Sequence, residues 1–245
     1  NYRNGLQSSV RLTLTWDSRN NRLFPTDGFY ASWSTEVADE AIGSRQSFVR
    51  HRATVRWYIT LLDPSPGPND EVVLKMNNEW GLITSRFAPG PPIFERFYLG
   101  GIFSVRGFPL TYLGPRVGVP SDFVPPEGGI VPQTGVAVGG NMQFYYNLEL
   151  EFPIIPQVQI RGVIFTDGGN AWNLDRYICQ LSAAPVGDPA ADPCRVDFFD
   201  IRTSWGFGIR WISSLGPLRF EWGFPFNPLP YEETSVFEFT IGNFF

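Results

Sequence analysis

Long apolar runs are absent from this chain of 245 residues. No stretch approaches the roughly 18 consecutive apolar residues of a membrane-spanning helix, so the sequence predicts no such helix. A basic excess is absent too: 19 Lys and Arg stand against 24 Asp and Glu, a formal net charge of -5. General nucleic-acid binders carry a basic face, so we expect no nucleic-acid partner.

Histidine is almost absent, and this narrows the possible chemistry. The single histidine, His51, falls among the apolar positions of its segment. A packing or lipid-interface residue is the more common interpretation there. No Cys/His cluster has metal-ligand spacing, no glycine-rich stretch continues into a phosphate loop, and no Gly-x-Ser-x-Gly elbow occurs. We therefore expect no catalytic residue, no metal, no cofactor and no enzyme activity.

Cysteine is scarce as well, with two residues in the whole chain. Cys179 and Cys194 lie in one polar segment, so a disulfide between them would close a short loop. Such a bond suits an oxidising compartment. Two free thiols are the alternative, and we treat the pair as a disulfide candidate.

Aromatic residues and turn formers are abundant. The chain has 22 Phe, 9 Tyr and 8 Trp together with 25 Gly and 22 Pro. This composition is typical of an all-β chain with frequent reversals. Apolar and polar residues alternate with period two, as in strands, and no useful helical periodicity occurs. In residues 201–211, for example, Trp205 and Phe207 fall on one side and Gly206 on the other.

Nine segments alternate in this way, and several have ten or more residues. Strands of soluble proteins are mostly about 5–6 residues long, whereas a tilted crossing of a bilayer needs about 9–11. The predicted strands are 10–17, 29–39, 48–61, 72–82, 142–152, 158–167, 201–211, 218–224 and 237–245.

The connections between these segments differ in length. Several are short, whereas 86–140 and 173–200 are long. Short turns at one end and long loops at the other are typical of an antiparallel outer-membrane β-barrel. A soluble β-sandwich or lipocalin-like barrel, with the apolar face inward, is the alternative. Small residues mixed with charges on the polar face favour a polar lumen.

Nine strands would leave two unpaired edges, which lipid cannot satisfy. We therefore expect a piece of a larger barrel; the alternative is that residues 1–9 belong to a truncated strand. Motifs occur at four places, in order along nearly the whole chain: FPTDG (24–28), FYLGG with VRGF (97–101 and 105–108), FTDGG (165–169), and LGPL with FEFTIGNFF (215–218 and 237–245).

On these motifs the chain resembles the C-terminal part of the barrel of the BamA-type outer-membrane protein insertase family. The resemblance implies a sixteen-stranded barrel in the bacterial outer membrane, of which residues 1–245 would supply the last nine strands. The first seven strands and the periplasmic polypeptide-transport-associated domains would be absent. It also implies that loop 86–140 lies outside the cell and folds back into the lumen.

The VRGF motif would form the tip of that loop. Val105, Arg106, Gly107 and Phe108 are its residues. Gly107 would let the backbone turn sharply. Phe108 would pack on lumen side chains such as Phe165.

Arg106 would need anionic partners, because an unpaired charge in a confined lumen is costly. Glu151 and Asp167 lie on the polar side of neighbouring predicted strands, so we expect Arg106 to pair with one or both. Gly168 follows Asp167 in the motif and is included in the expected anchor. A solvated arginine, or an anchor that only stiffens the barrel, are the other interpretations.

The terminal segment carries the predicted recognition signal of the family: Phe237, Phe239, Ile241, Gly242 and Phe245. These apolar side chains can also be explained as simply facing lipid. In the family this strand pairs weakly with the first strand, at a seam thought to open sideways.

Three functions fit these features. The first is an assembly factor that folds and inserts other barrels into the outer membrane. Its partners would be unfolded β-barrel clients, outer-membrane lipid and lipopolysaccharide, and accessory lipoproteins. The second is a translocation pore of the same superfamily, of the two-partner-secretion or TamA-like type. The third is a plain porin, against which the VRGF loop argues.

Overall fold

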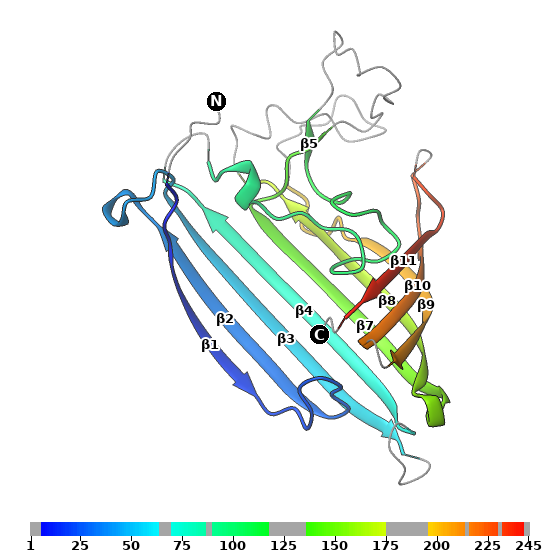
Figure 1. The fold of residues 1–245 in the computed structure, drawn as a ribbon. Helices are drawn as coiled ribbons and strands as arrows, with labels where there is room; N and C mark the ends of the chain where they lie inside the picture. Colours follow the sequence, from blue (N-terminus) through cyan, green and yellow to red (C-terminus); the bar gives the residue numbers. More distant parts are fainter. Residues whose placement is uncertain are drawn as a thin grey trace.

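The computed structural model describes residues 6–63, 70–86, 90–117, 136–174, 196–213, 216–229 and 232–242. Its main feature is one antiparallel sheet of nine strands (Figure 1), in the order β1-β2-β3-β4-β7-β8-β9-β10-β11. The strands are β1 (Val10–Asp17), β2 (Gly28–Ala38), β3 (Phe48–Leu62), β4 (Val72–Thr84), β7 (Met142–Ile155), β8 (Ile160–Trp172), β9 (Arg202–Ser213), β10 (Gly216–Pro225) and β11 (Val236–Ile241). The predicted all-β chain with nine strands is confirmed.

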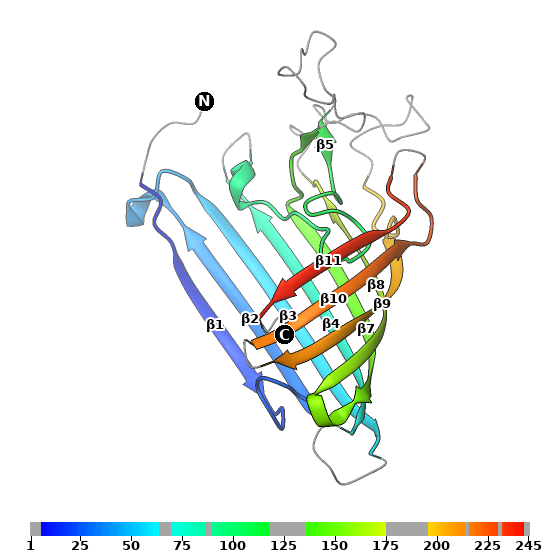
Figure 2. The same cartoon turned by 45° about the vertical axis from the view of Figure 1, so that its right-hand side comes forward.

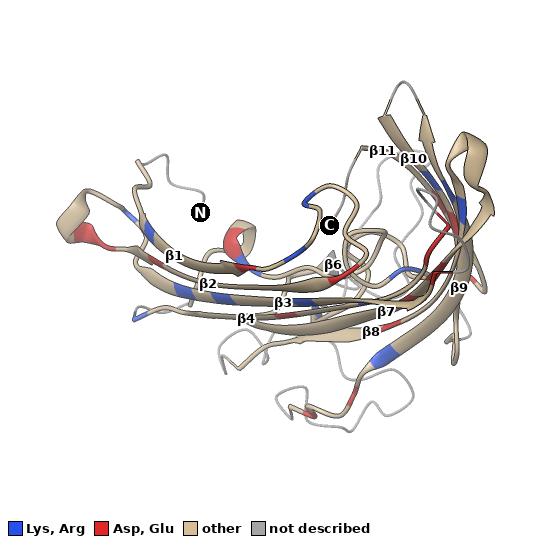
Figure 3. Cartoon of the chain, turned by 90° about the horizontal axis from the view of Figure 1, so that it is seen from below, with Lys and Arg blue, Asp and Glu red and all other residues tan. Residues whose placement is uncertain are grey.

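Each strand of the sheet pairs with its neighbours along the chain. The outermost strands are β1 and β11; in Figure 2, β1 lies at the left and β11 crosses the front of the sheet. Seen from below, the sheet is curved, and the segment between β4 and β7 lies on its concave side (Figure 3). We call the face that carries Glu149, Asp167, Arg210 and Glu221 the concave face, and the opposite one the convex face.

The convex face is apolar and exposed, because alternate residues of each strand point to it. Leu12, Ile164 and Phe207 expose 65%, 52% and 46% of their surface. Aromatic rings stack there across β9, β10 and β11, with Trp205 4.9 Å from Phe224 between ring centroids. So large an exposed apolar surface is that of a protein facing lipid.

Short elements fill the connections. They are the 3-10 helices η1 (Glu40–Ile42), η2 (Ile93–Glu95) and η3 (Pro156–Val158), and a two-stranded ribbon of β5 (Arg116–Val117) and β6 (Val136–Ala137). No helix in the described part of the chain is long and apolar enough to cross a membrane. The ribbon lies inside the long loop 86–140 and was not predicted.

Most predicted strand ends differ from the observed ones by one or more residues, and the start of β8 differs because of an unexpected turn. The segment 158–167 was expected to begin at Val158, but Val158 ends η3 and β8 begins at Ile160. Pro156 at the start of η3 has no N–H to give to a strand ladder, which favours a helical turn there. Gln159 closes that turn with φ +59°.

Candidate functional site

The loop between β4 and β7 forms a compact turn whose tip is Arg106. The Gly101 N–H donates to the Phe108 carbonyl at 2.8 Å, and the Leu113 N–H donates to the Leu99 carbonyl at 3.0 Å. These two backbone hydrogen bonds join the two sides of the turn, one near its tip and one nearer its base. Its tip lies against the concave face, where Arg106 is only 1% exposed.

Asp167 of β8 is the principal partner of Arg106. The guanidinium donates from Nε to Oδ2 and from Nη2 to Oδ1, both at 2.7 Å. The Arg106 backbone N–H donates to Oδ2 at 3.0 Å. Two parallel hydrogen bonds to one carboxylate are the strongest arrangement available to arginine. Of the two carboxylates expected to pair with Arg106, Asp167 does so.

Two further carboxylates and an aromatic ring complete the surroundings of Arg106. Its Nη1 lies 2.6 Å from Glu149 Oε1 and 2.9 Å from Glu221 Oε2. Its Cζ lies 3.6 Å from the centre of the Phe165 ring. Burial disfavours the charged guanidinium, but the three carboxylates outweigh it and hold the pKa of Arg106 well above its ordinary value.

Arg210 of β9 joins these carboxylates into one network. It donates to Glu149 and Glu151 at 2.8 Å, and to Glu221 at 2.8 and 3.0 Å. Arg219 of β10 also donates to Glu221, at 2.9 and 3.0 Å. Cations and carboxylates thus alternate across the concave face, so each buried charge lies beside an opposite one.

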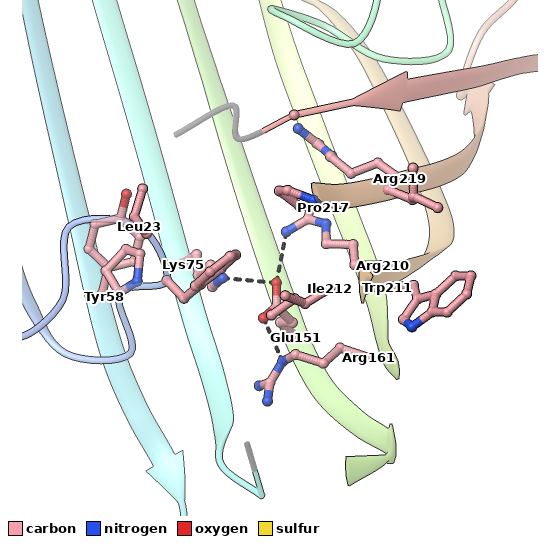
Figure 4. Close-up of a pocket in the computed structure, with 14 residues that line it drawn as sticks. Leu23, Tyr58, Lys75, Glu151, Arg161, Arg210, Trp211, Ile212, Pro217 and Arg219 are labelled. Carbon is pink, nitrogen blue, oxygen red and sulfur yellow. Dashed lines mark hydrogen bonds and ion pairs between the residues drawn. The ribbon is translucent and has the colours of Figure 1, made fainter. Parts of the chain in front are cut away.

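Glu151 does not pair with Arg106, so only Asp167 of the two expected carboxylates makes this contact. The partners of Glu151 are Lys75 at 2.8 Å, Arg161 at 2.6 Å and Arg210 at 2.8 Å (Figure 4). Glu151 lies two residues after Glu149 in β7, so it is on the same face but roughly 7 Å further along the strand. The loop tip stops at the level of Glu149.

A cavity of about 60 Å³ lies beside Glu151. Figure 4 shows Tyr58, Lys75 and Arg210 among the side chains around it. It has room for about two water molecules. The charge network therefore borders a small space lined by both charged and apolar side chains, and the loop does not fill the concave side at this level.

Glycines of β9 and β10 give the loop tip its seat. A Cβ added to Gly223 would lie 2.4 Å from the Gly107 nitrogen, so the loop rests directly on the strand backbone. A Cβ on Gly206 would lie 2.3 Å from the Phe165 ring. Gly107 itself has φ +85°, a conformation that favours glycine. Ser204 Oγ fixes the same point by donating to the Arg106 carbonyl.

The other residues of the motif pack inside the loop. Val105 and Phe108 are 0% and 1% exposed. They belong to an apolar cluster with Leu99, Leu113, Tyr145 and Ala171. The expected packing of Phe108 on Phe165 is therefore corrected: Phe108 packs in this cluster, and Phe165 lies under Arg106 instead.

Gly168 also differs from the expectation. It pairs with Tyr146 in the sheet, and a Cβ added to it would lie 2.6 Å from the Tyr146 ring. Since Asp167 points to the concave face, its neighbour Gly168 points to the convex face. Gly168 therefore makes room for a convex-face ring and does not contact the loop.

The predicted terminal signal lies on the convex face of β11. Phe237, Phe239 and Ile241 are 53%, 48% and 60% exposed. Phe239 packs against Phe220, with ring centroids 4.9 Å apart. The Gly242 N–H donates to the Pro217 carbonyl at 2.8 Å. Phe245, Cys179 and Cys194 lie outside the described residues.

Glu149, Glu221 and Arg210 are the site residues that sequence reasoning missed. All three alternate onto the predicted polar face, so that signal was present. It does not say which of many polar residues meets the loop tip. Among the residues that the structure describes, no group of three or more His, Cys, Asp or Glu could hold a metal ion.

The sequence of the chain is similar to that of a known protein family. A model of the Omp85 superfamily domain matches residues 1–245. The chain is 27% identical to the outer membrane protein assembly factor BamA of Neisseria meningitidis serogroup B, over 95% of this chain and 28% of that protein. It is 27% identical to the protein of the same name in Nitratidesulfovibrio vulgaris, over 98% of this chain and 26% of that protein. The chain thus spans little more than a quarter of the length of these curated relatives.

The fold has a counterpart among solved structures. A crystal structure of BamA from Haemophilus ducreyi lacking POTRA domains 1–3 matches with a TM-score of 0.74 and 24% identity. The match covers 95% of this chain and 41% of that chain. The nine-stranded sheet is therefore built like part of the barrel of that protein.

Proposed function

Because the chain belongs to the Omp85 superfamily and its sheet is that of a bacterial outer-membrane β-barrel, we propose that it acts in outer-membrane protein assembly. The whole protein would catalyse the folding and insertion of other β-barrels. Two observations support this proposal. Both curated relatives are named assembly factors, which favours assembly over translocation. The loop motif that implied this family is docked on the concave face through Arg106.

The proposed catalysis makes and breaks no covalent bond. A client strand in lipid must satisfy its backbone N–H and C=O groups, each of which costs several kcal/mol if left unpaired. An assembly factor lowers this barrier by offering a strand edge as a template for pairing. The anchored loop would hold the sheet beside that edge in one curvature while clients pair and leave.

The placement of the chain in the membrane is part of the proposal. Residues 1–245 would form the C-terminal part of the barrel, with periplasmic domains outside this segment. Loop 86–140 would lie at the extracellular end and its tip in the lumen. The concave face would then line the lumen, and the convex face would contact lipid.

The proposed partners follow from the same placement. Clients would be unfolded outer-membrane β-barrel proteins. The convex face would contact phospholipid and lipopolysaccharide, and accessory lipoproteins would join the whole protein.

The test replaces the native copy of the full-length protein in cells by variants. Depletion is expected to lower folded, heat-modifiable β-barrel clients in the outer membrane while periplasmic proteins stay constant. Arg106→Glu puts a fourth acid beside Asp167, Glu149 and Glu221, and we expect it to fail to restore clients. Arg22→Glu, the same change at a residue whose side chain is 84% exposed, serves as the matched control.

The level of each variant in the membrane is measured alongside. Asp167→Arg combined with Arg106→Glu is expected to restore part of the activity, since Glu149 and Glu221 still face the new acid. If depletion left folded clients unchanged, the assembly function would be wrong. If Arg106→Glu accumulated normally and supported clients fully, the loop anchor would have no part in it.

A further inference from the structure

Glu238 of β11 lies directly opposite Glu221 of β10. The two residues are partners in the antiparallel register, and their side chains point to the concave face. Glu221 is 1% exposed and Glu238 is partly buried. Like charges directly opposite each other destabilise a strand pair. The pairing of the last strand therefore contains a repulsive contact near its centre.

The loop touches both members of this pair. Arg106 Nη1 lies 2.9 Å from Glu221 Oε2. A Cβ added to Gly101 would lie 3.4 Å from Glu238 Oε1, so the loop backbone runs alongside this carboxylate. One short segment of loop thus contacts Glu221 through Arg106 and runs alongside Glu238.

Without Arg106, the carboxylates at this level outnumber the remaining arginines further. Arg219 contacts Glu221, and Arg210 is shared among Glu149, Glu151 and Glu221. With the loop docked, three arginines face four carboxylates at this level; without Arg106, two would face four. The arginines are Arg106, Arg210 and Arg219, and the carboxylates are Glu149, Asp167, Glu221 and Glu238.

We propose that Glu238 is a positioning residue through which the docked loop holds β11 on β10. With the tip seated, the Glu221–Glu238 pair is compensated and the last strand stays paired. When the tip withdraws, the two carboxylates repel and β11 loosens. Since β11 pairs with β10 directly beside the loop tip, the loop would control how readily this strand pairing opens. The inference rests on the proposed function only for the use of that edge; the pairing itself is a separate property.

The test is a double-mutant cycle on the full-length protein in lipid nanodiscs, read by amide hydrogen exchange in residues 236–241. The four proteins are the native one, Arg106→Ala, Glu238→Gln and the double variant. Glu238→Gln keeps the size of the side chain and one oxygen acceptor but removes the charge opposite Glu221. Exchange of these amides reports opening of the strand.

We expect Arg106→Ala to speed exchange in β11 about fivefold when Glu238 is present, as for one unfavourable like-charge pair. In the Glu238→Gln background the same change should have an effect under about twofold. Glu79→Gln removes a carboxylate from β4, away from β11, and serves as the matched control; in its background the full effect of Arg106→Ala should remain.

The proposal would be overturned if Arg106→Ala speeds amide exchange in β11 by the same factor in the native protein and in the Glu238→Gln variant. If Arg106→Ala does not fold, Arg106→Lys takes its place in the cycle, because it keeps the charge and loses the two-pronged contact. A smaller coupling of the same sign is then expected, and no coupling would again overturn the proposal. Client assembly is not part of the readout, so failure here leaves the proposed function standing.

Discussion

Arginine–carboxylate contacts lie beside both the base and the tip of the loop between β4 and β7, and the Arg11–Glu36 pair near the base is far more exposed than the tip. At the base of the loop, Arg50 of β3 contacts Glu95 of η2 and Glu36 of β2. Glu36 also binds Arg11 at 2.7 Å, whose side chain is 57% exposed. At the tip, Arg106 and Asp167 have side chains 1% and 0% exposed.

The same chemistry therefore has different consequences at the two places. Water can solvate Arg11 when its partner is removed, so the pair contributes little net stability. The Arg106 side chain is 1% exposed, so removing one partner leaves a buried charge with too little compensation. Loss of a partner should therefore cost far more at the tip than in the exposed Arg11–Glu36 pair, and three substitutions test this difference.

The largest effect is expected for Asp167→Ala. It removes three hydrogen bonds to Arg106, and breaking a buried pair costs about 3–5 kcal/mol. Urea unfolding of the purified protein in lipid vesicles measures the free energy of unfolding. Asp167→Asn, which keeps the shape and one acceptor, should lose less. A loss under about 1 kcal/mol for Asp167→Ala would mean that the tip resembles an exposed pair.

A smaller effect is expected for Gly223→Ala. The added methyl group would overlap the Gly107 nitrogen and Cα, at 2.4 and 2.6 Å, so the tip must rise from β10. Overpacking of this kind costs about 1–3 kcal/mol. Limited proteolysis should then cut residues 90–117 faster than in the native protein. Ser34→Ala, a small change on the concave face of β2, should leave cleavage unchanged; equal cleavage in both variants would contradict the contact.

The smallest effect is expected for Arg11→Ala. The exposed pair with Glu36 should contribute at most about 1 kcal/mol. This contribution should fall further as salt is raised, since exposed charges are screened. The same urea titration at low and high salt measures it. A loss as large as that of Asp167→Ala would show that burial does not separate the two places.

The strands were predictable because period-two alternation is a local property of the chain. All nine segments became strands, and the shift of β8 to Ile160 came from Pro156 and the turn it favours. The ribbon β5–β6 was missed because each of its strands has only two residues. So short an element leaves no readable alternation.

The site was predictable in part. Alternation places Glu149, Glu151 and Asp167 on one face, and Asp167 follows from its motif. How far the loop reaches along that face depends on the register of β7, β8 and β10 and on the packing of Leu99 and Phe108. These are long-range properties that no local pattern contains. For this reason the sequence predicted Glu151 as a partner of Arg106, whereas Glu149 and Glu221 contact Arg106 in the structure.

The seat of Arg106 also constrains the order in which the chain folds. Asp167 and Glu221 lie 61 and 115 residues after Arg106 in the chain. Gly223, under the tip, comes from the same late strand as Glu221. The loop is synthesised before this seat exists, so docking must wait until β7 through β10 have paired. Contacts between residues so far apart form late, because the loops that they close are entropically costly. A seated Arg106 is therefore a marker that the sheet beneath it is complete.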